Sequence, residues 1–284
     1  MATGTLRGPD IQRVARAGKE AGRGGVEWAA RVGYTARAAV YAVIGVLALM
    51  LAAGEGGQTT DTHGAVAEVA RQPFGSVLLV LLGVGLLAFA LWRFAQAAWD
   101  LEDKGRSGKG IAARVGMAGS GVIHASLALT AFNLLRGRGG GGSGGNQGLT
   151  AKLLSQPFGQ VLVVLVGVAV MAFAGYQLYR AWKGRMLEKL TLSGLAARRR
   201  TWVERICKAG VAARGVVFLL VGWFFIQAAL SADPGEAGGL GEALGTLAAQ
   251  PFGPWLLGVV ALGLVGYAVY QLCAARYRHI PTPS

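Results

Sequence analysis

The sequence predicts an all-α, polytopic membrane protein in which six transmembrane helices form three tandem, parallel two-helix repeats. Three observations predict this class: six long segments without charged residues, a one-sided distribution of basic residues, and a tetrapeptide that recurs three times in register. Two spans return the chain to its starting side, so all three repeats insert in the same orientation. A pseudo-three-fold bundle about the membrane normal satisfies this constraint, as does an arc or an irregular bundle.

Charged residues are scarce in the chain. Of the 284 residues, 53% are apolar and 15% are charged, whereas a soluble protein carries about 25% charged residues. A helix that crosses a hydrocarbon core of about 30 Å needs roughly 20 mostly apolar residues, and it satisfies its own backbone polar groups in lipid. The windows without Lys, Arg, Asp or Glu are 38–54, 72–92, 115–135, 153–179, 215–232 and 243–275.

These windows divide the chain into a tail and three repeats. Residues 1–27 are basic and Gly-rich, and we expect a loose cytoplasmic tail that becomes helical near Val26–Arg37. The expected repeats, each with its two spans, are 28–103 (34–53 and 74–99), 104–186 (115–135 and 158–182) and 187–284 (209–230 and 252–276).

Basic residues gather on one side of the predicted bundle. Only Arg71, Arg136, Arg138 and Lys152 lie on the other side, which leaves 24 of the 28 basic residues (28 − 4) on the side of the two termini. Positive charge is retained in the cytoplasm, so both termini are expected to be cytoplasmic. The same residues would face anionic lipid headgroups on that side.

The tetrapeptide Gln-Pro-Phe-Gly opens the second span of each repeat, at 72–75, 156–159 and 250–253. Pro suits the first turn of a helix, where its missing N–H is not needed, so we expect it there. Apolar residues three and six positions before the Gln predict a short amphipathic helix that lies on the outer leaflet.

The three repeats stay in register over both spans, which chance does not explain. In the first spans Gly33, Gly116 and Gly210 align, followed four residues later by Arg37, Ser120 and Arg214, and after four more by Tyr41, His124 and Phe218. In the second spans the aligned sets are Phe89, Phe173 and Tyr267; Trp92, Tyr176 and Tyr270; and Arg93, Gln177 and Gln271.

Three two-span units with Gln-Pro-Phe-Gly, the Arg37-x-x-x-Tyr41 pattern and the closing Ala275–Arg278 segment resemble the bacterial membrane family known as domain of unknown function 1206. The resemblance covers about residues 28–280. It implies six membrane helices in a bacterial plasma membrane, and it implies no activity. The middle repeat departs from the pattern at Ser120 and His124.

Ser120 and His124 are the candidate intramembrane polar site, because a deep ionisable group in a span is costly and is often functional. One interpretation is a proton-carrying or substrate-contacting pair that faces a central cavity. The other is a neutral core histidine, since Tyr41 and Phe218 occupy the matching positions.

Arg37, Arg93 and Arg214 are candidate contacts for lipid headgroups or anions. Each lies about one turn inside the cytoplasmic boundary, where a long side chain also reaches the interface by snorkelling. We expect no catalytic, metal or cofactor site: His63, His124 and His279 are scattered, Cys207 and Cys273 have no metal spacing, and no carboxylate pair lies in a span. The two cysteines are expected to fill helix ends as free thiols.

The leading functional hypothesis is a non-enzymatic structural, accessory or lipid-binding component of the plasma membrane. The alternative is a small transporter or channel with a pathway along the repeat axis at Ser120 and His124. Expected partners are membrane lipids with anionic headgroups, a membrane protein or a second copy of the chain. Nucleic acid is not expected, because the Arg198–Arg200 triplet has no folded domain around it.

Overall fold

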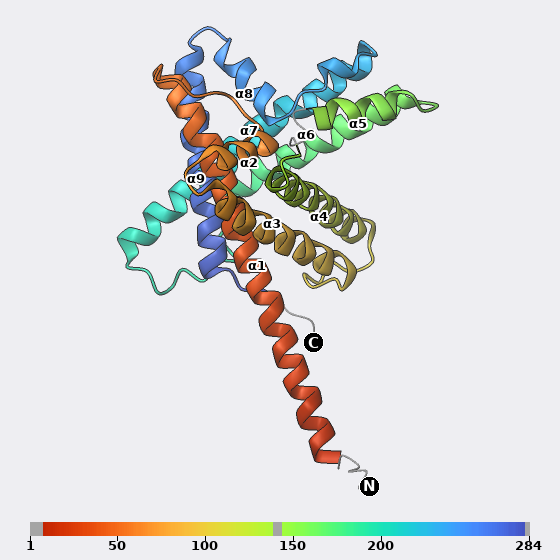
Figure 1. Ribbon diagram of the computed structural model, residues 1–284, viewed down its shortest axis with the longest axis vertical. Helices are drawn as coiled ribbons and strands as arrows, with labels where there is room; N and C mark the ends of the chain where they lie inside the picture. The colour runs from red at the N-terminus through yellow and green to blue at the C-terminus, as the bar shows by residue number, and fades with distance from the viewer. Residues whose placement is uncertain (1–7, 139–143, 282–284) are drawn as a thin grey trace.

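The protein structure, a computed structural model, describes residues 8–138 and 144–281 and is all-α over that part of the chain (Figure 1). Six helices each contain a stretch long and apolar enough to cross a membrane, which confirms the predicted class. They are α1 (Gly8–Ala53), α3 (Gly75–Ala98), α4 (Gly108–Leu135), α6 (Gly159–Lys183), α7 (Ala197–Leu230) and α9 (Gly253–Tyr277).

A short helix precedes the second long helix of each repeat, as the apolar spacing predicts. These are α2 (Thr62–Arg71), α5 (Gly144–Leu154) and α8 (Leu240–Ala248), the last following a 3₁₀ turn, η1 (Pro234–Glu236). One residue in matching register is fully buried in each: Val66, Thr150 and Leu244. The short helices therefore pack against the ends of the long helices through that face.

The N-terminal tail differs from the expectation of a loose segment. Residues 8–27 are helical and continue α1, which projects far beyond the bundle at its N-terminal end (Figure 1). Helix α7 likewise begins at Ala197, well before the expected span at 209. Arg, Lys, Ala and Glu are strong helix formers, so a helix nucleated by the bundle continues past the apolar segment.

The prediction that Pro occupies the first helical turn is wrong. Helix α3 begins at Gly75, and the preceding Phe74 has a left-handed backbone with φ of 62°. The Gly75 N–H donates to the Gln72 carbonyl at 2.8 Å. Pro in second place, a positive φ in third place and this hydrogen bond define a type II turn.

The same turn recurs at Phe158 and Phe252, with φ of 62° and 60°. The closing Gly is required by space: a Cβ at Gly75 would collide with the Ala70 carbonyl at the end of α2, and Gly159 and Gly253 face matching collisions. The turn leaves each Phe side chain at least 80% exposed. Gln-Pro-Phe-Gly is therefore a tight corner that presents an aromatic ring where two helices meet.

The long helices pack in three pairs, each joining the second helix of one repeat to the first helix of the next: α3 with α4, α6 with α7, and α9 with α1. The last pair returns from repeat 3 to repeat 1, so the order is cyclic, as a pseudo-three-fold arrangement requires. Within repeats, α1 packs against α3 and α7 against α9. Over the described residues α4 and α6 form no such contact, so the ring is open at the middle repeat.

The three aligned glycines show the same difference between the middle repeat and the other two. A Cβ at Gly33 would lie 2.7 Å from Phe89 Cα, and a Cβ at Gly210 would lie 2.7 Å from Tyr267 Cα, so backbones touch at both sites. At Gly116 an added Cβ would meet nothing within 4 Å. The glycine that fits two helices together in repeats 1 and 3 thus faces open space in repeat 2.

Candidate functional site

The guanidinium of Arg214 lies inside the bundle. Arg214 is only 8% exposed. Its guanidinium donates from Nε to Tyr41 Oη at 2.9 Å and from Nη1 to Gln177 Oε1 at 2.6 Å. Aromatic rings surround it, the nearest being Phe218 with its centroid 4.3 Å from Cζ. Arg214 therefore binds helices α1, α6 and α7 together and does not reach outward as a snorkelling arginine would.

Arg37 occupies the matching place in repeat 1. Its Nη2 donates to Tyr267 Oη at 2.9 Å, and the Gln271 amide oxygen, oriented toward it, accepts from Nε at 3.0 Å and from Nη1 at 2.9 Å. The Phe89 ring lies 4.6 Å from its Cζ. Arg37 bonds the hydroxyl of Tyr267, and Arg214 Cζ lies 5.0 Å from the centroid of the same ring, so the two cations share one tyrosine.

Arg93 supplies the third guanidinium from α3. It donates from Nη1 to Gln96 Oε1 at 2.9 Å, and its Cζ is 5.8 Å from the Phe89 centroid. Phe89 is 1% exposed and lies between Arg37 and Arg93. We call Arg37, Arg93 and Arg214, with the aromatic and amide groups around them, the arginine cluster.

Each helix pair carries one of these arginines opposite an uncharged polar residue at the matching position. In the α9–α1 pair Arg37 faces Gln271, and in the α6–α7 pair Arg214 faces Gln177. In the α3–α4 pair the two roles are exchanged, since Arg93 holds the glutamine position and Ser120 the arginine position. The middle repeat therefore supplies no guanidinium at either position, and the α3–α4 pair keeps one because α3 of repeat 1 carries Arg93.

The positive charge of the cluster has no carboxylate partner in the described residues. Every salt bridge found in residues 8–138 and 144–281 involves other cations. Tyrosine hydroxyls, amide oxygens and ring faces solvate the guanidiniums instead. These groups carry no net charge, so the cluster keeps its positive charge. Cation–π contacts are worth about 2 kcal/mol when desolvated, which is less than the several kcal/mol that burying a charge in a membrane costs.

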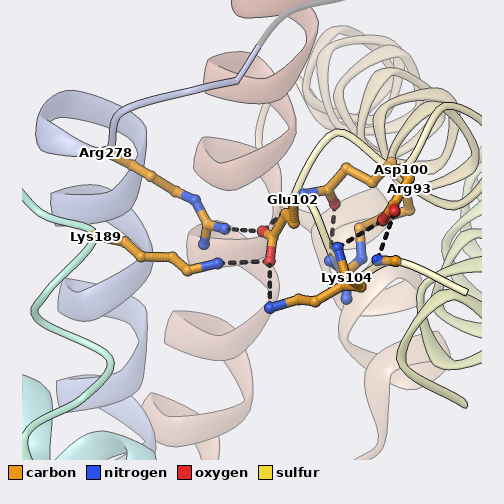
Figure 2. A network of polar contacts seen from close by, with 8 residues as sticks. Arg93, Asp100, Glu102, Lys104, Lys189 and Arg278 are labelled. Atoms are coloured by element: carbon orange, nitrogen blue, oxygen red, sulfur yellow. Dashed lines mark hydrogen bonds and ion pairs between the residues drawn. The ribbon is translucent and has the colours of Figure 1, made fainter. Parts of the chain in front are cut away.

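A second network closes the end of the bundle where the loops between repeats meet (Figure 2). The Glu102 carboxylate, 8% exposed, accepts from Lys189 Nζ at 2.5 Å and from Arg278 Nη2 at 2.7 Å, with Lys104 Nζ at 3.6 Å. Glu102 lies in the α3–α4 loop, Lys189 in the α6–α7 loop and Arg278 at the end of α9. One carboxylate thus ties together the two loops that join the repeats and the end of α9.

Electrostatics in this network stabilises the ionised carboxylate. Burial alone would raise the pKa of Glu102, but the hydrogen bond and charge of Lys189, with Arg278 and Lys104, lower the pKa to about 2. Burial lowers the pKa of Lys189, and Glu102 opposes that effect. Backbone N–H groups of Lys104 and Gly105 lower the pKa of the nearby Asp100 carboxyl by binding its charged form.

The network connects to the arginine cluster through Gln96, whose Nε2 donates to Glu102 Oε1 at 3.0 Å while its Oε1 accepts from Arg93. Polar contacts therefore run without interruption from the loops to the third guanidinium. Sequence reasoning missed Glu102, Lys189, Arg278 and Gln96, because loops from different repeats carry no local pattern that brings them together. The exchange of Arg and Ser between helices was, by contrast, readable from the aligned repeats.

Ser120 and His124 lie near the cluster on α4. His124 is 9% exposed, and its Nδ1 is 2.7 Å from the Ser120 carbonyl oxygen. Its ring packs against Phe89 with the centroids 4.6 Å apart and the planes tilted by 54°. The histidine thus contacts the same ring as Arg37 and bonds the Ser120 backbone. Cys207 and Cys273 are buried free thiols, as expected.

These features define the protein as a six-span membrane protein of three two-helix repeats with a cluster of one buried and two half-buried arginines. The chain belongs to the Domain of Unknown Function 1206 family, whose model matches three times, at 32–100, 115–184 and 209–278. It is 35% identical over 250 residues to "Uncharacterized protein YxxB" of Bacillus subtilis (strain 168), covering 88% of this chain and 90% of that protein. No solved structure matches it.

Proposed function

We propose that this protein is a non-enzymatic membrane component that binds the anionic headgroup of a lipid at the arginine cluster. The observation that carries the proposal is the set of one buried and two half-buried guanidiniums with no carboxylate partner in the described residues. Guanidinium groups match the planar, paired oxygens of phosphate and carboxylate. A bound anion would neutralise the cluster.

Unsatisfied donors support the same ligand. Gln177 is 5% exposed, and its Nε2 has no hydrogen-bond partner, while its Oε1 is engaged by Arg214. The Nε of Arg93 is also buried without a partner. Buried donors left unpaired cost about 1–3 kcal/mol each, and oxygen atoms of a headgroup would remove that cost.

The depth of the cluster suits a headgroup. Arg37 lies 16 residues before the end of α1 at Ala53 (53 − 37), and Arg214 lies 16 residues before the end of α7 at Leu230 (230 − 214). At 1.5 Å per residue this is about 24 Å, so in a core of about 30 Å both lie about 6 Å from the far boundary. The one-sided distribution of basic residues supports assigning that boundary to the cytoplasmic leaflet of a plasma membrane, with both termini in the cytoplasm.

The cluster supports binding better than chemistry or transport. Its side chains offer cationic donors, amides and rings, a set suited to holding an anion and not to activating a nucleophile. Buried Tyr41, Phe89 and Tyr267 fill the space between the arginines. A transport pathway along the repeat axis would have to displace these rings.

Lipid-dependent stabilisation tests the proposal. The thermal unfolding midpoint in neutral detergent is compared with and without added phosphatidylglycerol, for the wild type, for Arg37→Gln/Arg214→Gln, and for Arg198→Gln/Arg199→Gln, which removes two exposed charges from the same side. We expect the lipid to raise the midpoint of the wild type and of the exposed control, and to have little effect on the cluster variant. Equal lipid-dependent shifts in all three proteins would refute the cluster as the site.

A further inference from the structure

The middle repeat exposes on α4 a face that the other repeats bury. Ile123 is 57% exposed, whereas the aligned Val40 and Val217 are 2% and 0% exposed. Gly116, two turns earlier on the same face, has open space around it. In repeats 1 and 3 this face packs against the second helix of the same repeat.

Helix α6 exposes the complementary face. Phe173 and Tyr176 are 46% and 56% exposed. The aligned residues of the other repeats are at most 8% exposed, namely Phe89 and Trp92 in α3 and Tyr267 and Tyr270 in α9. Two faces that would form one interface are therefore both partly exposed in this conformation.

The residue types of that interface are nevertheless kept. The small residue stays small at Gly33, Gly116 and Gly210, and the residue that it would meet stays aromatic at Phe89, Phe173 and Tyr267. A face that only contacted acyl chains would not need a glycine opposite an aromatic ring. The sequence of the middle repeat therefore encodes the same close approach that the structure shows in the other two.

We propose that α4 and α6 close against each other in a second conformation, with Gly116 meeting Phe173, and that the α4–α6 gap is a lateral gate between the bilayer and the arginine cluster. The closed form completes the three-fold ring. The open form, described above, leaves one layer of side chains between the gap and the cluster.

The side chains beside the α4–α6 gap lie next to the arginine cluster. On the α6 side Phe173 lies 5.7 Å from Arg214 Cζ, one turn before Gln177. On the α4 side His124 packs against Phe89, which in turn contacts Arg37. Side chains one layer deep thus separate the gap from two of the guanidiniums.

The packing also shows how the gate would move. Helix α4 packs extensively against α3, and α6 against α7, so we expect each pair to move as one body. The Glu102–Lys189 ion pair joins the α3–α4 loop to the α6–α7 loop, which leaves a pivot at that end of the gap. This gate rests on the proposed lipid site: a lipid whose headgroup lies at the cluster passes its chains through the gap and holds it open.

Disulfide crosslinking tests closure. In a Cys207→Ala/Cys273→Ala background, Gly116→Cys is combined with Phe173→Cys, and the protein is placed in vesicles of phosphatidylcholine alone or mixed with phosphatidylglycerol. The matched control combines Gly116→Cys with Val161→Cys, which lies about 18 Å farther along α6 at 1.5 Å per residue. Gly119→Cys with Ala169→Cys, aligned with the contacting pairs Ala36–Gly85 and Ala213–Gly263, repeats the test one turn away if the first pair does not fold.

We expect intramolecular crosslinking in phosphatidylcholine to be about tenfold faster for the Phe173 pair than for the Val161 control, because proximity raises the effective concentration of the thiols. Phosphatidylglycerol should slow it several-fold. Rates equal to the control in both vesicles, or crosslinks only between two chains, overturn closure. Closure at the same rate in both vesicles overturns the gate, while the lipid site itself is judged separately by the unfolding shifts of the arginine variants.

Discussion

Replacing the three aligned glycines with alanine tests the open ring directly. At Gly33 and Gly210 the new Cβ would lie 2.7 Å from a backbone Cα of the facing helix, and a backbone atom yields less easily than the end of a side chain. Overpacking of this kind costs about 1–3 kcal/mol. At Gly116 the Cβ meets open space, and Ala is favoured over Gly in a helix by about 1 kcal/mol.

The expected order of stability is therefore Gly116→Ala above the wild type, with Gly33→Ala and Gly210→Ala below it. Helix propensity offsets part of the packing cost at the last two sites, so their net loss is about 1–2 kcal/mol. Reversible unfolding in mixed micelles, followed by circular dichroism, measures all four proteins under one condition. If Gly116→Ala loses as much stability as Gly33→Ala, then α4 and α6 pack in the ground state and the open ring is wrong.

Two further substitutions address the loops and the corners. Glu102→Gln should destabilise the protein at pH 7 by about 3 kcal/mol, because the pKa of Glu102 is lowered from 4.5 to about 2 and each tenfold change in proton affinity is worth about 1.4 kcal/mol. A carboxyl whose pKa is lowered by folding stabilises the protein above its ordinary pKa, and this stabilisation is lost as pH falls. Thermal unfolding at pH 7 and pH 3 should therefore show that the stability difference between the wild type and Glu102→Gln is smaller at pH 3, whereas the exposed Glu55→Gln should leave stability unchanged at both pH values. A wild-type-to-variant difference that is the same at both pH values would contradict the ion-pair account. Phe74→Gly should raise stability in detergent by about 1 kcal/mol, because the left-handed φ of 62° at this position strains a bulky residue. Phe74→Ala keeps the strain and should give no such gain in the same unfolding assay. Equal effects of the two substitutions would argue against strain.

The fold class was largely predictable from the sequence because membrane spans depend on composition over about 20 residues. Charge-free windows and the threefold tetrapeptide therefore led to six helices in three repeats. The boundaries of α1 and α7 were less predictable, since a helix continues through basic residues as readily as through apolar ones. The turn at Phe74 was missed because nothing local predicts a bulky residue with positive φ.

About half of the candidate site was predictable from the sequence. Arg37, Arg93 and Arg214 stood out by their depth, but the direction of their side chains depends on tyrosines and glutamines from other helices, which local sequence does not pair. The Glu102 network depends on three loops that meet only in the folded bundle. The missing α4–α6 contact was not predictable, because Gly116 and Phe173 carry the same residue types as their packed counterparts.

The exchange of Arg93 and Ser120 between helices provides the most direct test of the central claim that each helix pair contributes one guanidinium to an anionic-lipid site. Phosphatidylglycerol affinity is measured by titration for Arg93→Gln and for Arg93→Gln/Ser120→Arg, the second of which recreates the arrangement of Arg37 with Gln271. We predict that the single variant binds about tenfold more weakly, as expected for the loss of one charged hydrogen bond, and that the double variant recovers most of the affinity. A double variant that binds no better than Arg93→Gln, or a single variant that binds as well as the wild type, would contradict the account.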